Sequence, residues 1–522
     1  MSEKNYLHLQ NGSDIRGVAC EGIEGEPISL TPEAARYIGF AFAKMIADKT
    51  GKNISDVKIS VGRDSRISGP MILKAFAEGV VFGGANVLDC GLSTTPAMFM
   101  SVIYEETACD GSCMCTASHL PFNRNGLKLF SKDGGFEKSD ITTLLTLAAS
   151  DEVVSELSDL KASYNLEASG NPLVSPAKYS VFNLIDLYSE NLRRIIKDGV
   201  YSTDDFEHPL KGLHIVVDAG NGSGGFFASK VLEPLGADIS GSQFLEPDGY
   251  FPNHIPNPEN KEAMAAICRA TVSSKADMGI IFDTDVDRMS AVFSDGSPIN
   301  RDACIALASA IIAPSHKEAT VVTDSVTSDR LTDFLENSLG LKHLPFKRGY
   351  KNVINKCKEL NADNIDCPLA METSGHGCMK ENHYMDDGSY LAVKFITALA
   401  KNKNLPLLIK DFKMKFSDKE VRFKIKDNNF AAYGEKVLEA FKKEAVSKNY
   451  TLPVVFEGVR ISFAKGSLSD AFKGGWIVLR ASLHDPVMVL NMEAENDCDL
   501  KLIAGAVKDM LIPFKSLDIS AL

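Results

Sequence analysis

The sequence predicts an α/β protein in which three similar α/β domains follow one another and a smaller C-terminal α+β domain closes the chain. Two observations lead to this prediction. The chain has 522 residues, whereas a single hydrophobic core rarely serves more than about 250–300 residues. Helix-like and strand-like segments alternate up to about residue 400, which is typical of helices that cover the faces of a largely parallel sheet.

The first α/β segment shows this alternation most clearly. Apolar residues recur at helical spacing in two stretches, and short apolar runs between them predict strands. The expected elements are a helix over residues 31–50, a strand over 57–61, a helix over 70–82, a strand over 86–88, and two strands over 113–115 and 126–130 that the turn 121–125 joins. The polar, serine-rich residues 150–175 predict an insertion or linker.

The rest of the chain supplies two more α/β segments and a final segment of different character. The second begins at Leu213 with LHIVVDAGNGSGG and reaches ADMGIIFDTDVDR, and the third starts near Asn300, contains ATVVTDS and ends around Ala400. A lysine-rich stretch then leads to a strand in VRFKIKD, a helix over 431–445, strands over 460–464 and 476–480, and a closing amphipathic helix. We therefore predict four domains, at residues 1–178, 179–299, 300–413 and 414–522.

Composition and charge exclude several functional classes. No apolar run approaches the roughly 18 residues that a membrane span needs, and the first residues, MSEKNYLHLQ, lack a signal-peptide pattern, so we expect a cytoplasmic protein without a membrane partner. Eleven cysteines scattered over the chain are typical of reduced thiols. The net charge of −13 argues against nucleic acid as a partner, and an anionic substrate would require the site to gather its own positive charge.

The stretch CMCTASHLPFNRNGLKLF places Ser118 in a tight polar loop between two predicted strands. A serine held in this way can project its hydroxyl into a cleft. A free serine hydroxyl is a poor nucleophile unless a base, a metal or a phosphoryl group changes its chemistry. We expect the adjacent His119 to point away from the serine, so the partners of Ser118 must come from elsewhere in the chain.

The stretch MGIIFDTDVDRMSAVF sets Asp283, Asp285 and Asp287 directly after an apolar strand. Alternate residues of an extended segment point the same way, so the three carboxylates should converge. Carboxylates that lie close together repel one another unless a divalent cation neutralises them, and an all-oxygen ligand set favours magnesium over zinc. A solvated acidic turn is the alternative interpretation.

The same strand also permits a different chemistry. Haloacid-dehalogenase-type phosphotransferases present an aspartate nucleophile in a D-x-D pair at the end of such a strand, and MDDG at residues 385–388 could supply their distal acidic pair. Those enzymes usually continue with a threonine, as in D-G-T, whereas Val286 and Asp287 follow here. This interpretation also leaves Ser118 without a role.

Four motifs, one in each predicted domain and in the right order, resemble those of the α-D-phosphohexomutases, the phosphoglucomutase and phosphomannomutase family. TASHLPFNRNGLK looks like the family's phosphoserine loop, DTDVDR looks like its magnesium loop, ETSGH looks like its sugar-recognition loop, and RASLHDP occupies the place of its phosphate-binding loop. SDIRG, GRDSR and DAGNG also match. The largest departure is SLHDP where the family commonly has SGTEP, because it removes a glycine and a hydroxyl and introduces Asp485 where phosphate is expected.

The resemblance implies a phosphohexomutase, with three α/β sandwich domains of mixed sheets and a smaller α+β domain around a central cleft. Such an enzyme interconverts the 1-phosphate and 6-phosphate of glucose or mannose. Ser118 would carry a phosphoryl group, and a sugar 1,6-bisphosphate would serve as intermediate and activator. The resemblance implies Ser118, Asp283, Asp285 and Asp287 as ligands of Mg²⁺ and Ser118, Lys128, Arg16 and His376 as catalytic residues. Substrate-binding residues would be Arg288, Lys347, Arg348, Lys351, Glu372, Ser374, His376, Arg480 and Ser482, with Arg63, His119 and His484 in support.

Other functions stay open at this point. Within the same family the chain could be a phosphoglucosamine mutase or a sugar-bisphosphate synthase or phosphatase, and outside catalysis it could be a phosphosugar-binding protein. We expect a phosphosugar partner and a monomer or dimer. The glycine spacing of DAGNGSGG does not fit G-x-G-x-x-G, so we do not predict a nucleotide site there. Cys109, Cys113 and Cys115 match no common zinc knuckle, and strand packing explains them better.

Overall fold

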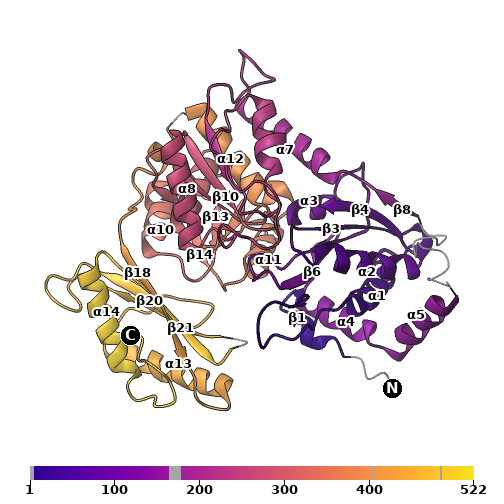
Figure 1. Ribbon diagram of the computed structural model, residues 1–522. Coiled ribbons are helices and arrows are strands. Elements are labelled where there is room, and N and C mark those ends of the chain that lie inside the picture. The colour runs from indigo at the N-terminus through magenta and orange to yellow at the C-terminus, as the bar shows by residue number, and fades with distance from the viewer. Residues whose placement is uncertain (1–4, 164–177, 403, 483–484) are drawn as a thin grey trace. The chain divides into compact units, whose positions relative to one another are not determined.

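The structure is a computed structural model that describes residues 5–163, 178–402, 404–482 and 485–522. The chain divides into two compact units, one of residues 1–300 with 374–405 and one of residues 301–373 with 406–522. The colour gradient of Figure 1 follows the chain from its N-terminus to its C-terminus through the labelled elements of both units.

The first sheet of the first unit is mixed. Its strands follow the order β1 (Gln10–Asn11), β2 (Asp14–Val18), β6 (Arg124–Ser131), β5 (Gly111–Cys115), β3 (Lys58–Arg63), β4 (Asn86–Leu92) and β8 (Tyr179–Val181), with β7 (Gly134–Gly135) paired to β6. β3 runs parallel to β4 and β5, whereas β6 runs antiparallel to both β5 and β2. The connection from β5 to β6 is therefore a tight loop, and it contains Ser118.

Within the described residues, five helices accompany this sheet: α1 (Pro32–Thr50), α2 (Gly69–Phe82), α3 (Thr95–Met100), α4 (Lys138–Ala148) and α5 (Asp151–Ser163). α1 begins where the Thr31 side chain accepts a hydrogen bond from the N–H of Ala34. It approaches α2 closely because Gly39 carries no side chain; a Cβ there would lie 2.1 Å from the carbonyl oxygen of Phe76. The expected helices 31–50 and 70–82 correspond to α1 and α2, and the expected strands 57–61, 86–88, 113–115 and 126–130 correspond to β3, β4, β5 and β6.

The prediction of an insertion or linker over residues 150–175 is wrong for its first part. Residues 151–163 form α5, and its residues Val153 and Leu157 are buried in the same hydrophobic core as α1, α2 and α4. Exposed serine and acidic side chains give this segment its polar composition, while a few apolar residues at helical spacing make the packing contacts. Residues 164–177 lie outside the described part of the chain.

The second sheet of this unit contains β12 (Pro298–Ile299), β11 (Met289–Phe293), β10 (Met278–Phe282) and β9 (Ile215–Asp218), in that order. β10 runs parallel to β9 and antiparallel to β11, with Phe282 opposite Met289. The six residues between them therefore close a hairpin. The unit also contains α7 (Leu184–Val200), the π-helix η3 (Phe227–Leu232), α8 (Lys261–Ser274), the antiparallel pair β16 (Gly377–Met379) and β17 (Met385–Asp386), and α12 (Gly388–Asn402), which packs against α7.

The second unit contains parallel and antiparallel strand pairings. β13 (Thr320–Thr323) runs parallel to β14 (Lys342–Pro345) and β15 (Leu369–Met371), near α9 (Asp302–Ile312), α10 (Asp329–Asp333) and α11 (Tyr350–Ala362). An antiparallel sheet follows the order β18 (Ser417–Lys424), β21 (Val487–Ala494), β20 (Gly475–Ala481) and β19 (Val459–Phe463), with α13 (Phe430–Ser447) and α14 (Asp497–Leu511) packed on it. The sequence analysis did not predict β21, the strand between β18 and β20.

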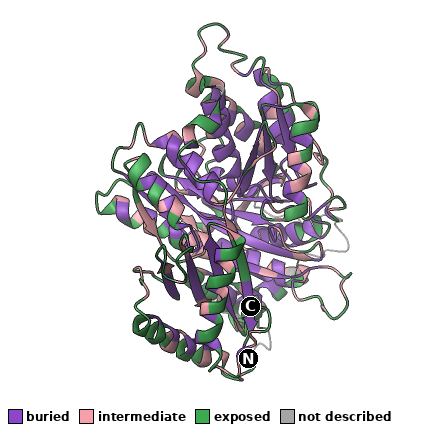
Figure 2. Ribbon diagram, turned by 90° about the vertical axis from the view of Figure 1, so that its left-hand side faces the viewer, coloured by how far each residue is buried: buried purple, intermediate pink, exposed green. Residues whose placement is uncertain are grey.

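The predicted fold class is confirmed. Sheets with helices between their strands make up the earlier part of the chain, and the last domain is smaller and α+β. The remaining elements of the described residues are short helical turns: η1 (Leu7–Leu9), η2 (Ile54–Asp56), η4 (Glu233–Leu235), η5 (Phe334–Ser338), η6 (Lys380–Asn382) and η7 (Leu405–Ile409). Figure 2 shows buried residues along the strands and exposed residues on the outer sides of the helices. Among the helices of the described residues, none is long and apolar enough to cross a membrane.

Candidate active site

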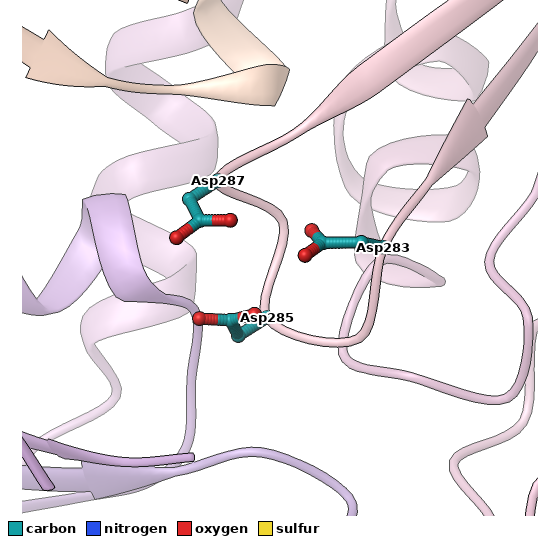
Figure 3. Close-up of side chains that lie close together, drawn as sticks. All are labelled: Asp283, Asp285 and Asp287. Atoms are coloured by element: carbon teal, nitrogen blue, oxygen red, sulfur yellow. The ribbon is translucent and has the colours of Figure 1, made fainter. Parts of the chain in front are cut away.

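Three buried aspartates gather in the loop between β10 and β11 (Figure 3). Carboxylate oxygens of Asp283, Asp285 and Asp287 all lie within 4.8 Å of one another. The sequence analysis derived this convergence from alternation along an extended segment, and that explanation is wrong. Residues 284–287 are turns and bends, and none of residues 283–287 pairs with a strand, so the curvature of the hairpin loop brings the carboxylates together.

Neighbouring segments hold this loop by its backbone. Three consecutive carbonyls each accept a hydrogen bond from a backbone N–H of a different segment: Thr284 from Ser223 at 2.8 Å, Asp285 from Thr95 at 2.9 Å, and Val286 from Gly388 at 3.0 Å. Val286 has φ 67°, a left-handed backbone conformation that is unfavourable for a β-branched residue. Because such a conformation persists only where its surroundings determine it, we attribute the shape of the loop to these contacts.

The DAGNG stretch after β9 packs against the same loop. A Cβ at Gly222 would lie 2.6 Å from the carbonyl oxygen of Thr284, so a glycine is needed for this approach. Asp218 accepts hydrogen bonds from the N–H of Gly220 at 2.9 Å and from Nε2 of Gln243 at 2.7 Å. Gly222 therefore allows the motif to pack on the aspartate loop, whereas Asp218 holds the backbone of the motif itself.

Ser118 reaches the aspartate loop from the connection between β5 and β6. Its Oγ donates to Oδ2 of Asp283 at 3.0 Å and accepts a hydrogen bond from Nη2 of Arg288 at 2.6 Å. Arg288 also donates through Nε to Oδ2 of Asp283 at 3.0 Å. The three side chains form a closed set of contacts, in which the guanidinium favours negative charge on a group attached to the serine oxygen.

The expectation that His119 points away from the serine is wrong. Its Nδ1 lies 3.3 Å from Oγ of Ser118 and also contacts Nη2 of Arg288. Burial and the charges of Arg288 and Arg16 lower the pKa of His119 to about 2, so its imidazole is neutral near pH 7. His119 therefore accepts a hydrogen bond from Arg288 beside the serine but adds no positive charge.

Arg66 holds the serine loop, and the sequence analysis did not assign it a role. Its buried guanidinium donates to four carbonyls of the loop, those of Pro121 at 2.7 Å, Arg124 at 2.9 Å, Leu120 at 2.7 Å and Ser118. Asp64 forms an ion pair with Nε of Arg66 at 3.2 Å and accepts a hydrogen bond from Oγ1 of Thr116 at 2.7 Å. In the sequence, the feature that could have indicated this role is the pair of opposite charges in GRDSR, directly after an apolar strand.

Lys128 projects from β6 into the aspartate group. Its Nζ donates to Oδ2 of Asp285 at 2.8 Å and also contacts Oδ2 of Asp287. Burial alone would lower the pKa of Lys128, but these two carboxylates raise it well above its ordinary value. The ammonium therefore acts as a cation bound by the aspartates, and Lys128 can accept a proton only after these contacts change.

The balance of charge in this group leaves room for a divalent cation. Three carboxylates face the positive side chains of Lys128 and Arg288, and a phosphoryl group on the serine would add a charge of about −2. Burial and the negative charge of Asp287 raise the pKa of Asp283 to about 8. Burial would raise the pKa of Asp287 as well, yet Lys128 and His376 hold it below its ordinary value. Negative charge is thus in excess, and the raised pKa of Asp283 reflects this excess.

Two oxygens of the group are suited to bind that cation. Within the described residues, Oδ1 of Asp285 and Oδ1 of Asp287 are buried and accept no hydrogen bond. A buried carboxylate oxygen that accepts no hydrogen bond is unfavourable unless an ion or a water satisfies it. Oxygen donors of this kind suit Mg²⁺, so the residues present fit the metal that the sequence predicts.

His376 joins the group from the segment that precedes β16. Its Nε2 lies 3.6 Å from Oδ1 of Asp287, and its Nδ1 lies 2.9 Å from Oγ of Ser374. Arg16, on β2, donates to Asp14 at 2.8 Å, and its charge acts on the nearby His119 and Lys128. The first unit therefore brings together nine of the side chains that the sequence nominated, namely Ser118, His119, Lys128, Asp283, Asp285, Asp287, Arg288, Ser374 and His376.

Arg348 and Glu372 lie in the second unit, beside two carboxylates that the sequence analysis did not name. The backbone N–H of Arg348 donates to Oε1 of Glu457 at 3.0 Å, and the next N–H along the chain donates to Oε1 of Glu372 at 2.7 Å. Asp324 accepts a hydrogen bond from Oγ1 of Thr373 at 2.8 Å, and burial together with Glu372 raises the pKa of Asp324 to about 7. For Asp324, the available signal was its position directly after a strand.

Arg480 and Ser482 lie at the end of β20 in the same unit. Burial and, to a smaller extent, the charge of Arg348 lower the pKa of Arg480. Nε of Arg480 is buried and has no hydrogen-bond partner in the described part of the chain. Oγ of Ser482 accepts a hydrogen bond from the N–H of Asp485 at 3.1 Å, and the Asp485 side chain is exposed. His484 lies outside the described residues.

The remaining nominated residues are less directly involved. Lys347 is exposed, and Lys351 is half-buried on α11. Arg63 donates to the carbonyl of Asp64 at 2.9 Å. Cys113 and Cys115 are fully buried on β5, as expected for residues that pack a strand into the core.

Comparison with known proteins places this geometry in context. The chain matches family models described as phosphoglucomutase/phosphomannomutase α/β/α domain I over residues 8–152, domain II over residues 196–296 and domain III over residues 300–415. It is 28% identical over 502 residues to a phosphomannomutase/phosphoglucomutase of Pseudomonas putida, which covers 96% of this chain and 94% of the relative. It is 26% identical over 500 residues to a phosphoglucomutase of Neisseria gonorrhoeae, with 95% of each chain covered. A solved structure of a phosphoglucomutase/phosphomannomutase family protein from Burkholderia thailandensis matches with a TM-score of 0.71 and 25% identity, covering 96% of each chain.

Proposed function

Because the chain belongs to the phosphoglucomutase/phosphomannomutase family of α-D-phosphohexomutases, we propose that it interconverts hexose 1-phosphate and hexose 6-phosphate, with glucose or mannose as the sugar. The observation that carries this proposal is the contact of Oγ of Ser118 with Asp283 and Arg288 at the buried aspartate group. Phosphoryl transfer depends on a carrier oxygen, a cation site and a positive side chain that meet at one place. The first unit offers all three.

The proposed transfer changes two bonds at one phosphorus. The bond to Oγ of phosphorylated Ser118 breaks, a bond to a free hydroxyl of the phosphosugar forms, and the proton of that hydroxyl passes to a base. The resulting bisphosphate turns over and returns its other phosphoryl group to Ser118, which leaves the isomer. A sugar 1,6-bisphosphate would phosphorylate Ser118 at the start and so activate the enzyme.

Lys128 and Arg288 have separate roles in this step. Mg²⁺, held by Ser118, Asp283, Asp285 and Asp287, would neutralise charge on the transferring group. Arg288 adds a fixed donor to the same group. When the carboxylates no longer engage Lys128, burial lowers its pKa, and the amine can exchange a proton with the sugar oxygen.

Recognition of the sugar and of its second phosphate falls to other residues. We assign Glu372, Ser374 and His376 to the sugar hydroxyls. The guanidinium groups of Arg348 and Arg480, of which the first acts by its charge on the second, suit a phosphate through their planar donors, and Ser482 adds a hydroxyl. We further assign Arg16, Lys347, Lys351, Arg63, His119 and His484 to the supporting charge and hydrogen bonds, and we retain residues 1–178, 179–299, 300–413 and 414–522 as the proposed domains.

An aspartate-nucleophile mechanism fits the contacts less well. Both oxygens of Asp283 are engaged, Oδ2 by Ser118 and Arg288 and Oδ1 by the N–H of Arg288 at 3.2 Å. Asp387, from the alternative acidic pair, accepts hydrogen bonds from Oη of Tyr188 at 2.6 Å and from Nδ2 of Asn382 at 3.0 Å. These contacts support a structural role for Asp387 instead of acid–base chemistry.

An isomerisation assay with several sugars tests the proposal. The protein is incubated with Mg²⁺, a trace of glucose 1,6-bisphosphate and either glucose 1-phosphate, mannose 1-phosphate or glucosamine 1-phosphate, and products are followed by phosphorus NMR. We expect 6-phosphates of glucose or mannose, loss of turnover on chelation, and recovery with Mg²⁺. Turnover of glucosamine 1-phosphate alone would indicate a phosphoglucosamine mutase. Release of inorganic phosphate without an isomer would indicate a phosphatase, and binding without any product would contradict the proposed reaction.

A further inference from the structure

Thr95 links the first domain to the aspartate loop of the second. It is the first residue of α3 and is 1% exposed. Its Oγ1 donates to Oδ2 of Asp285, and its backbone N–H donates to the carbonyl oxygen of Asp285 at 2.9 Å. One threonine therefore holds both the side chain and the backbone of an aspartate that is 190 residues away in the sequence.

This two-point contact leaves the other carboxylate oxygen of Asp285 unused. Oδ2 receives hydrogen bonds from Thr95 and from Nζ of Lys128. Oδ1 is buried and accepts no hydrogen bond within the described residues. A carboxylate that is fixed through one oxygen presents the other at a defined position, and groups that orient metal ligands in this way usually raise metal affinity by about 10–100-fold.

Thr95 is better suited than Lys128 to define that position. Lys128 reaches the carboxylate through a flexible four-carbon chain, so it supplies charge with little orientation. Thr95 has a short β-branched side chain with few rotamers, at the start of a helix that the side chain of Thr94 caps by accepting from the N–H of Ala97 at 3.2 Å.

The aspartate loop needs such an external constraint. Its Val286 has φ 67°, so the loop does not hold this shape by local preference. Ser223 and Gly388 contact the carbonyls on either side of Asp285 and fix the path of the chain. Among these three donors of the loop, Thr95 also engages the side chain of a candidate metal ligand.

We propose that Thr95 is a positioning residue for the metal site, because it fixes Asp285 so that Oδ1 is free to bind Mg²⁺. This role rests on the proposed function, which supplies the metal. The prediction is specific to the hydroxyl: a serine at position 95 keeps the donor, whereas a valine keeps the shape of the side chain and removes the donor.

Direct metal binding tests this role without any sugar or turnover. Mn²⁺ binding is followed by electron paramagnetic resonance and Mg²⁺ binding by calorimetry, for the full-length protein and for Thr95→Val, Thr95→Ser and Thr94→Val. We expect Thr95→Val to weaken the affinity about 10–100-fold and Thr95→Ser to stay within about threefold of the unmodified protein. Thr94→Val, which removes the helix cap and leaves the contact with Asp285, should lower thermal stability but keep the affinity within about threefold.

The outcomes separate this inference from the proposed function. If the unmodified protein binds neither metal, the metal site itself is contradicted. If it binds metal and Thr95→Val binds equally well, only the positioning role is overturned. An equal loss in Thr94→Val would assign the effect to α3 instead of the Thr95 hydroxyl and would also overturn it. Should Thr95→Val fail to fold, Thr95→Ala removes the hydroxyl without adding a methyl group and carries the same expectation.

Discussion

Oγ of Ser118 lies 3.0 Å from Oδ2 of Asp283, although 165 residues separate the two in the chain. The contact joins the loop between β5 and β6 to the loop between β10 and β11. Each loop is held by its own contacts, since Arg66 binds carbonyls of the first and Thr95 donates to a carbonyl of the second. The proposed reaction centre therefore depends on residues that shape two loops as well as on the groups that we propose to react.

Removal of the Lys128 ammonium should impair the reaction but not the metal site. We expect Lys128→Met to lower kcat by about 10²–10⁴, because general acid–base catalysis contributes about that factor. Mn²⁺ affinity should not fall, since the ammonium competes with a metal for Asp285 and Asp287. Lys132→Met is the control, because the Lys132 side chain is 58% exposed. Lys128→Met with more than half of the original activity would contradict the assigned role.

Replacement of Arg66 by lysine should loosen the serine loop. One ammonium cannot satisfy the carbonyls and the carboxylate that the guanidinium binds, so buried acceptors lose their hydrogen-bond partners. This loss should lower the free energy of unfolding by about 1–3 kcal/mol. Hydrogen exchange measured by mass spectrometry should become faster over residues 116–125, and kcat should fall. Arg36→Lys serves as the control, because Arg36 also donates through two nitrogens, to Glu78. Unchanged exchange over residues 116–125 in Arg66→Lys would refute this role.

A single methyl group at Gly222 should disturb the aspartate loop. The Cβ of Gly222→Ala would lie 2.6 Å from the carbonyl oxygen of Thr284, and the loop must shift to relieve this clash. We expect weaker Mn²⁺ binding and a loss of stability of about 1–3 kcal/mol. Gly505→Ala is the control, because a Cβ at Gly505, in α14, has no neighbour within 4 Å. It should raise the free energy of unfolding by about 0.5–1 kcal/mol and leave Mn²⁺ binding unchanged. Equal Mn²⁺ affinity in both variants would show that the loop tolerates the methyl group.

Asp302 should make the second unit less stable as the pH rises from about 4 to 6. Burial and the charge of Glu493 raise the pKa of Asp302 to about 6 in the folded protein, from an ordinary value of 3.8. Between these values the folded state binds more protons than the unfolded state, so protonation stabilises the fold below about pH 4 and this contribution is lost above about pH 6. This difference in the pKa of Asp302 corresponds to about 3 kcal/mol in the free energy of unfolding.

Urea unfolding at several pH values tests this dependence. Trp476, the only tryptophan of the sequence, lies on β20 in the same unit as Asp302, so its fluorescence reports on that unit. Asp302→Asn keeps an oxygen that can accept from the N–H of Ser328, and it has no proton to lose. The free energy of unfolding of Asp302→Asn, minus that of the unmodified protein, should rise as the pH rises from 4 to 6. Above that range this difference should rise no further. A constant difference over the whole range would contradict the assignment.

Much of the site could be predicted from the sequence because its residues lie in short local motifs. Ser118 and Lys128 share one strand–loop–strand segment, and the three aspartates share one loop. The fold class followed from the alternation of segments. Composition was misleading for residues 151–160, where exposed polar side chains concealed the apolar face of α5.

The contacts between these motifs could not be predicted from one sequence. Arg66 binds backbone carbonyls, which every residue has, so its partners leave no trace in the sequence. Thr95 and Asp285 meet only because the fold brings the start of α3 to a loop that is distant in the sequence. The shape of the aspartate loop depends on a strained Val286, whose conformation no local preference would predict. Tertiary contacts decide these features.

Phosphopeptide mapping after incubation with glucose 1,6-bisphosphate and Mg²⁺ tests the central claim most directly, because it identifies the residue that carries the phosphoryl group. The account predicts one phosphate on the peptide that contains Ser118, and neither phosphate nor mutase activity in Ser118→Ala. Phosphate on Asp283, or a Ser118→Ala protein with full mutase activity, would contradict it.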